Sequence, residues 1–242
     1  ITNTITGTAT TVNVTAPGQI QDGIDVAAPG GTVKVAAGTY AEHLVLAKQL
    51  TLEGAQAGVD ARGRVADEST ITAASGTVLT LQNGSAGSVI DGFTFRGGWR
   101  GIESASGPLN ALQILNNRLV GFTGNGVFLN DNGVDITVHQ NVIDGSSKTG
   151  SGALFHLDQD NFDGFQFTNN HVVNGRVAGS GTGFFVDGNH NVGQSLARSP
   201  LFSGNLFDNN TTGANLGRFA FEYGTVSQNV FSNNSFDGLQ GG

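Results

Sequence analysis

One sequence frame recurs along this chain and constrains its fold more than any other feature. An apolar residue is followed three positions later by Asn and five positions later by a second apolar residue. The copies are Ile114/Asn117/Leu119, Val138/Asn141/Ile143, Phe167/Asn170/Val172, Phe202/Asn205/Phe207 and Val226/Asn229/Phe231, and Ile90/Phe93/Phe95 carries Phe in the Asn position. The internal geometry is constant while the spacing between copies varies, which predicts a solenoid whose insertions lie between the repeated units.

A second apolar-alternating run follows the repeated frame in successive copies. The runs are Val127–Leu129, Phe155–Leu157, Phe184–Val186 and Phe219–Phe221. Period-2 alternation bounded by Gly and Asn is typical of short strands. Two or three short strands in each turn of roughly 24 residues predict the coils of a parallel β-helix, stacked about 4.8 Å apart. In such a stack the repeated Asn is expected to be buried and to bond to the next coil.

The start of the chain predicts a cap for this solenoid. Ile20, Ile24, Ala27 and Ala28 share one face of a short helix, which the Pro29-Gly30-Gly31 stretch should end. Such a helix would cover the apolar end of the stack. No similar cap is visible at the other end, where Gly238-Leu239 should begin another strand. We therefore expect part of a larger protein, or an end that a partner or a second copy covers.

Two regions carry a resemblance to a known family. Residues 19–54 include GGTVKVAAGTY and LTLEGA, and residues 88–242 include VIDGFTFRGG, ILNNRLVG, VHQNVIDG, FTNNHVVNG and SQNVFSNN. These stretches resemble the right-handed, single-stranded parallel β-helix repeats of the pectate-lyase-like superfamily. The resemblance implies one all-β domain over residues 1–242, with the cap and first coil in 19–54 and the Asn-ladder repeats in 88–242. It implies little about activity, because the superfamily includes lyases, hydrolases, esterases, epimerases and non-catalytic surface proteins.

Composition restricts the partners of this chain. It has 242 residues, 38 of them Gly, with a net charge of −8 and no Cys or Met. The missing Cys excludes disulfides and thiolate metal sites. The negative charge argues against nucleic acid and anionic lipid as partners. No apolar run approaches the ~20 residues of a spanning helix, so membrane insertion is not expected. The absence of Cys and Met, the most readily oxidised residues, together with few Lys, favours a secreted or cell-surface bacterial setting.

An outward acidic column is the most informative candidate site. Aligning the second runs predicts neighbouring columns of Asn130, Asp158, Asp187 and Glu222, of Phe128, His156, Phe185 and Ala220, and of Asn132, Asp160 and Asn189. Three interpretations stay open. The carboxylates are a solvated face, or Asp158, Asp160, Asp187 and Glu222 bind calcium through oxygen ligands. In the third, Asp158, Asp187 and Glu222 form a catalytic set with His156 and Arg218.

The catalytic interpretation can be tested by looking for the short catalytic motifs of related enzymes. Related polygalacturonases carry Asn-Thr-Asp, Asp-Asp, Gly-His-Gly and Arg-Ile-Lys, and alginate epimerases and lyases carry Asp-Pro-His. None of these occurs here. The sequence therefore favours a non-catalytic module of a large adhesin-like or repeat protein, with a polysaccharide lyase, hydrolase or epimerase as the alternative. Trp99 and Arg100 are either a sugar-stacking platform or loop packing, and Phe128 and Phe185 are further candidates for carbohydrate contact.

Overall fold

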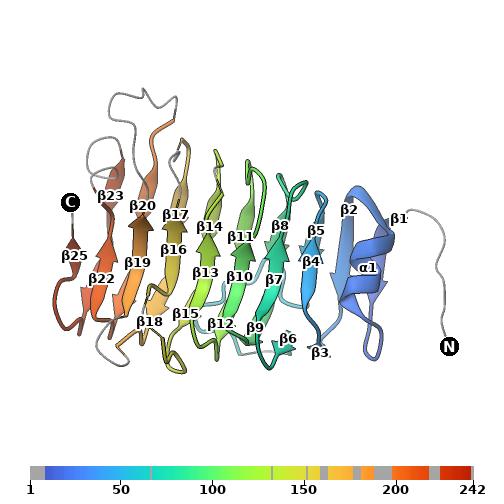
Figure 1. Ribbon diagram of the computed structural model, residues 1–242, viewed down its shortest axis with the longest axis horizontal. Coiled ribbons are helices and arrows are strands. Elements are labelled where there is room, and N and C mark those ends of the chain that lie inside the picture. The colour runs from blue at the N-terminus through green and yellow to red at the C-terminus, as the bar shows by residue number, and fades with distance from the viewer. Residues whose placement is uncertain are drawn as a thin grey trace.

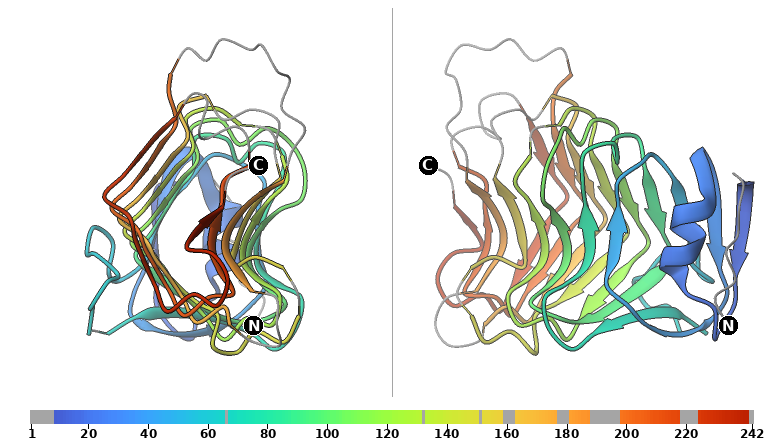
Figure 2. Two further views of the ribbon diagram at one scale, coloured as in Figure 1. Left: turned by 90° about the vertical axis from the view of Figure 1, so that its left-hand side faces the viewer. Right: turned by 45° about the vertical axis from the view of Figure 1, so that its right-hand side comes forward.

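The chain winds as a right-handed parallel β-helix made of three parallel sheets (Figure 1). The computed structural model describes residues 9–65, 67–131, 133–150, 152–158, 163–176, 181–187, 198–217 and 224–240. Viewed along the axis, successive coils superimpose around a common interior (Figure 2). The predicted fold class is thus confirmed.

Each coil adds one strand to each of the three sheets. Sheet A contains β1 (Ala9–Val14), β2 (Ala27–Val35), β5 (Thr51–Glu53), β8 (Val89–Asp91), β11 (Gln113–Leu115), β14 (Thr137–His139), β17 (Gln166–Thr168), β20 (Leu201–Ser203) and β23 (Thr225–Ser227). Sheet B contains β3 (Gly38–Ala41), β6 (Ser69–Ala73), β9 (Phe93–Gly97), β12 (Arg118–Val120), β15 (Val142–Asp144), β18 (His171–Val173), β21 (Leu206–Asp208) and β24 (Val230–Ser232). Sheet C contains β4 (Leu44–Leu46), β7 (Thr77–Leu81), β10 (Arg100–Ser104), β13 (Asn125–Leu129), β16 (Phe155–Asp158), β19 (Thr182–Asp187), β22 (Thr212–Asn215) and β25 (Leu239–Gln240).

The repeated sequence frame corresponds to the corner between sheets A and B. Its first apolar positions align strand by strand in sheet A, as Ile90, Ile114, Val138, Phe167, Phe202 and Val226. Its second apolar positions align in the same way in sheet B, as Phe95, Leu119, Ile143, Val172, Phe207 and Phe231. The residue before the Asn takes a positive φ, for example 54° at Asn116 and 55° at Gln140. This left-handed bend turns the chain from one sheet to the next.

The repeated Asn residues form the buried ladder that the frame predicts. Asn117, Asn141 and Asn170 are fully buried, and Asn205 is 1% exposed. The Oδ1 atom of each Asn accepts the backbone N–H of the residue in the same position one coil earlier, over 3.0 Å for Asn117 to Phe93, 2.8 Å for Asn141 to Asn117 and 2.9 Å for Asn170 to Asn141. The Nδ2 atoms donate to backbone carbonyls, such as Ile114 O at 2.8 Å from Asn141. The coils from Phe93 to Asn229 are thereby bonded to one another at this corner.

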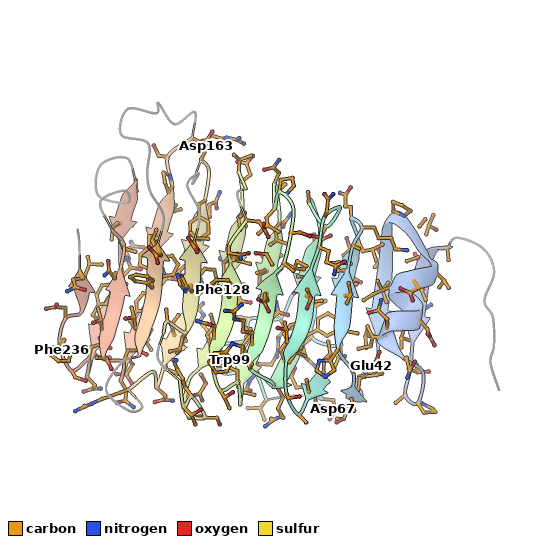
Figure 3. All side chains as sticks on the ribbon, viewed as in Figure 1. Glu42, Asp67, Trp99, Phe128, Asp163 and Phe236 are labelled. Carbon is orange, nitrogen blue, oxygen red and sulfur yellow. The ribbon has the colours of Figure 1, made fainter. Side chains whose placement is uncertain are left out.

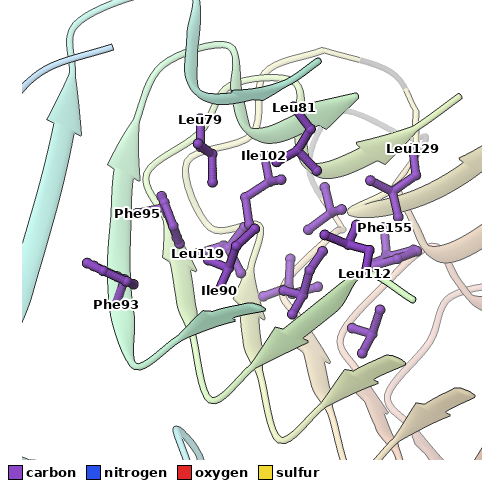
Figure 4. Close-up of a cluster of buried hydrophobic side chains, with 14 of the residues drawn as sticks. Leu79, Leu81, Ile90, Phe93, Phe95, Ile102, Leu112, Leu119, Leu129 and Phe155 are labelled. Atoms are coloured by element: carbon purple, nitrogen blue, oxygen red, sulfur yellow. The ribbon is translucent and has the colours of Figure 1, made fainter. Parts of the chain in front are cut away.

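The interior becomes richer in aromatic side chains along the axis towards the C-terminus. Leu79, Leu81, Ile90 and Ile102 are among the buried side chains of the middle coils (Figure 4). Towards the C-terminus, phenylalanine rings stack on one another, with centroids 5.2 Å apart for Phe155 and Phe184, 5.3 Å for Phe167 and Phe202, and 5.2 Å for Phe207 and Phe231. The Phe-rich strands thus supply the core, since aromatic rings bury much apolar area in each coil.

The N-terminal cap differs in detail from the prediction. Helix α1 (Ile20–Val26) buries Ile20 and Ile24 and lies at the end of the stack (Figure 2). The helix ends at Val26, and Ala27 begins strand β2 instead of continuing the helical face. The extended conformation at Ala27 allows β2 to pair with β1, a strand outside the repeated frame in which Val12 and Val14 alternate with Thr11 and Asn13. The carboxylate of Glu42 accepts the first helical N–H groups, those of Ile20 at 2.8 Å and Gln21 at 3.0 Å.

One strand of sheet C lies elsewhere than the alternation pattern placed it. The strand that stacks on β19 is β22, not the predicted Phe219–Phe221, and Phe185 pairs with Asn215. Small residues are required here, because a Cβ on Gly213 would lie 2.7 Å from the ring of Phe231. Strand β22, with the sequence TGAN, therefore lacks the large alternating apolar residues of the other strands. Residues 218–223 lie outside the described part of the chain.

A long connection between β5 and β6 folds back over the corner of sheets A and B. It covers residues 54–68, with residue 66 outside the description, and projects from the coils as the teal segment in Figure 2. Within it, the buried Arg64 forms a two-point ion pair with Glu68, at 2.8 and 2.9 Å. The bonds to later coils join Gly58 N to Asp91 Oδ2 at 3.0 Å, Arg64 Nη1 to Asn116 O at 2.7 Å and Ala61 N to Gln140 O at 3.2 Å.

Candidate functional site

The outer face of sheet C carries the predicted aromatic column. Phe128, His156 and Phe185 are register partners on β13, β16 and β19, and Glu103 on β10 aligns with Phe128. The residues on either side of Phe128 and His156 are buried, and Phe185 follows the buried Phe184 and precedes the half-buried Val186, so the column itself points outward. The sequence alignment of these three coils is confirmed by the strand register.

The column is a continuous series of stacked groups. The Arg100 guanidinium lies 3.8 Å from the centroid of Phe128 and forms an ion pair with Glu103. The Phe128 and His156 rings meet edge to face at 4.9 Å, and those of His156 and Phe185 at 5.2 Å. Arg100 thus covers one face of Phe128. The expected carbohydrate contacts of Phe128 and Phe185 stay predictions.

His156 is the chemically distinctive member of the column. Its Nε2 atom is buried and has no hydrogen-bond partner among the described residues. Burial lowers the pKa of His156, the carboxylates of Asp158 and Asp187 oppose this, and the Arg100 guanidinium adds to it. The net pKa lies below the ordinary value of 6.5, so the imidazole is neutral at pH 7. A neutral imidazole can accept a proton or a hydrogen bond from a ligand hydroxyl.

The acidic column is only partly described. Asp158 and Asp187 are exposed and stand opposite one another on adjacent strands. Asn130 follows Leu129, the partner of Leu157, and so precedes Asp158 in the same column. The other predicted members, namely Asp160, Arg218 and Glu222, lie outside the described residues. Within the described ranges no group of three or more His, Asp or Glu side chains is placed to hold a metal ion, and calcium binding stays a prediction.

Trp99 lies directly against two glycines of the following coils. A Cβ on Gly124 would fall 2.6 Å from Trp99 Cε2, and one on Gly150 would fall 3.0 Å from Cη2. The indole nevertheless remains 46% exposed. The Gly124 N–H donates to Trp99 O at 2.8 Å and fixes the two coils together. Figure 3 labels Trp99 and Phe128 on the side of the molecule that faces the viewer, with Trp99 lower in the view.

The two interpretations of Trp99 are therefore compatible. The indole packs on glycine backbone on one side, while about half of its surface is open to solvent. Gly124 aligns with Trp99 one coil later, since Arg100 pairs with Asn125, whereas Gly150 lies in the coil after that and shares no register position with Trp99. Only the three-dimensional stacking shows that the ring reaches across both coils.

Comparisons with protein-family models, with curated proteins and with solved structures return no match for this chain. No helix in the described ranges is long and apolar enough to cross a membrane. The functional argument accordingly rests on the site itself.

Proposed function

We propose that this chain is a non-catalytic, glycan-contacting β-helix module of a secreted or cell-surface protein of the adhesin-like or repeat type, within the pectate-lyase-like superfamily. The observation that carries the proposal is the Trp99 indole, held against Gly124 and Gly150 with the rest of its surface open. A sugar ring presents C–H groups on its face, and these pack favourably on a flat aromatic surface.

The way in which Trp99 is held favours a binding role. An exposed Trp on a mobile loop would lose side-chain freedom when it stacks on a ligand, whereas this ring is already fixed against two coils. The rigid backbone beneath it also fixes the distance to the aromatic column of Phe128, His156 and Phe185.

Two substitutions test the role of Trp99. Trp99→Ala removes the ring, and Gly150→Val displaces it, because the new side chain would meet only the indole and the more distant Thr123 O at 3.5 Å. We expect both to weaken binding of a soluble polysaccharide about tenfold or more in isothermal titration. Phe236→Ala is the matched control, since Phe236 is also an exposed aromatic residue, at 77%.

The result that contradicts the proposal is equally definite. The titration uses xylan, glucomannan, arabinogalactan and polygalacturonate in turn. If none of them binds, or if Trp99→Ala and Phe236→Ala bind equally well, Trp99 is not a glycan contact.

A second candidate function is a polysaccharide lyase, hydrolase or epimerase. The observation that favours it is the unpartnered Nε2 atom of His156 beside Asp158 and Asp187. Such an enzyme would release product from one of these polysaccharides, and Asp187→Asn would abolish the release. The non-catalytic proposal predicts no turnover.

If calcium binds at the acidic column, saturating calcium raises Tm, and the double substitution Asp158→Asn with Asp187→Asn removes the increase.

A further inference from the structure

A separate hollow lies on the outer face of sheet A. Its volume is about 410 Å³, and it spans strands β11, β14, β17 and β20 of four successive coils. Small-molecule sites commonly have volumes of roughly 300–1,000 Å³. Thr137, Gln166 and Leu201 line it from one outward column, and Leu115, Thr168 and Ser203 line it from the next.

Seven of the nine described residues that line the hollow have polar side chains, although more apolar than polar surface faces it. Apart from Leu115 and Leu201, the described residues that line the hollow are Thr, Ser, Gln, Asn and His, with no Asp, Glu, Lys or Arg among them. The whole chain, in contrast, has a net charge of −8. An anionic ligand would find no cation in this hollow and would be repelled by the rest of the molecule. The lining therefore suits a neutral ligand rich in hydrogen-bonding groups.

The polar groups are held in place before any ligand arrives. His139 Nδ1 lies 2.7 Å from Thr168 Oγ1 on the adjacent coil, and Ser203 Oγ lies 2.9 Å from Ser227 Oγ on the next. The strands beneath are joined in register from β11 to β23. The hydroxyl groups of Thr168 and Ser203 thus stand at fixed coil spacings, with Leu115 and Leu201 as apolar surface beside them.

We propose that this hollow is a second glycan site, specific for a neutral oligosaccharide. Sugar hydroxyls would bond to Gln166 and to the hydroxyl groups of Thr137 and Ser203, while ring faces would pack on Leu201. The hollow lies on a different sheet from the aromatic column, so it is independent of Trp99. Two sites on different faces of one rigid rod would let a single module contact two strands of a glycan matrix and gain from multivalency.

The test uses the full chain carrying Trp99→Ala, which removes the other proposed contact. The probes are cellohexaose, mannohexaose and maltohexaose, with hexagalacturonate as the charged comparison, in isothermal titration. We expect at least one neutral probe to bind and hexagalacturonate not to bind. Gln166→Ala should weaken binding roughly fivefold through the loss of a hydrogen bond. Leu201→Arg, which fills the hollow, should abolish binding.

The matched control is Gln113→Ala. Gln113 occupies the same outward column as Thr137 and Gln166 but does not line the hollow, so binding should not change. If Leu201→Arg lowers Tm, Gln166→Ala alone decides the question. The proposal is overturned if no neutral probe binds, if hexagalacturonate binds more tightly, or if Gln166→Ala and Gln113→Ala behave alike. The glycan role of Trp99 is judged independently. It is contradicted if the wild-type chain and the Trp99→Ala variant bind polysaccharide equally well.

Discussion

Replacement of Asn170 by Leu tests how the coils are held together. Asn170 is fully buried, and its Oδ1 accepts the backbone N–H of Asn141 at 2.9 Å and Asn141 Nδ2 at 3.0 Å. Its Nδ2 donates to Val138 O at 3.0 Å and to Asn205 Oδ1 at 3.2 Å. Leu has a similar size but none of these groups. The backbone N–H of Asn141 then loses its side-chain acceptor, and Val138 O loses its side-chain donor.

The cost follows from these two losses. A buried polar group without a partner costs about 1–3 kcal/mol, and the added apolar surface of Leu offsets part of the sum, so Asn170→Leu should destabilise the fold by about 2–4 kcal/mol. For a chain of this length that lowers Tm by roughly 4–16 °C. Thermal unfolding followed by circular dichroism measures the shift. Asn13→Leu, at an exposed position on β1, is the matched control and should leave Tm nearly unchanged.

A clear result would refute this reasoning. If Asn170→Leu and Asn13→Leu shift Tm equally, the ladder does not contribute to stability, and stacking of the core side chains alone holds the coils in register.

Three further predictions concern pH, the long connection and the end of the stack. Burial lowers the pKa of His156 and of His171 below 6.5 in the folded protein. As the pH falls below 6.5, the unfolded chain therefore binds more protons than the folded one, which destabilises the fold. Tm should fall between pH 7.5 and 5, and a constant Tm would contradict this. Arg64→Ala should cost roughly 2–4 kcal/mol because it breaks a buried ion pair, whereas Lys34→Ala, which removes an exposed pair, should cost under about 1 kcal/mol. The edges of β23, β24 and β25 end their sheets, so light scattering should detect end-to-end association as concentration rises, and a monomer at every concentration would refute it.

The repetitive part of this fold could be predicted from the sequence. The frame around Asn117 and its later copies identified the corner between sheets A and B, the ladder and the residues that stack in each coil. The prediction succeeds because every coil repeats the same backbone bend, so one local pattern specifies many contacts. The column of Phe128, His156 and Phe185 was found in the same way.

The non-repetitive features could not be predicted in this way. Glu42 caps the helix from another coil, and Arg64 fastens its loop to Asn116, 52 residues further along the chain. Neither contact leaves a periodic pattern. A second short ladder, in which Asn234 Oδ1 accepts the backbone N–H of Asn210 at 3.0 Å, does correspond to a sequence spacing. Both residues stand five positions after a ladder Asn.

The glycan role of Trp99 can be measured directly, because it is the only Trp in the chain. Its fluorescence therefore reports on the proposed contact without a label. We predict that titration with the polysaccharide that binds most tightly changes the emission of Trp99 in a saturable way and protects it from a soluble quencher. Gly150→Val should lose both effects while Tm stays near that of the wild type. Emission and quenching that remain unchanged at saturating polysaccharide would contradict the proposal that Trp99 contacts glycan.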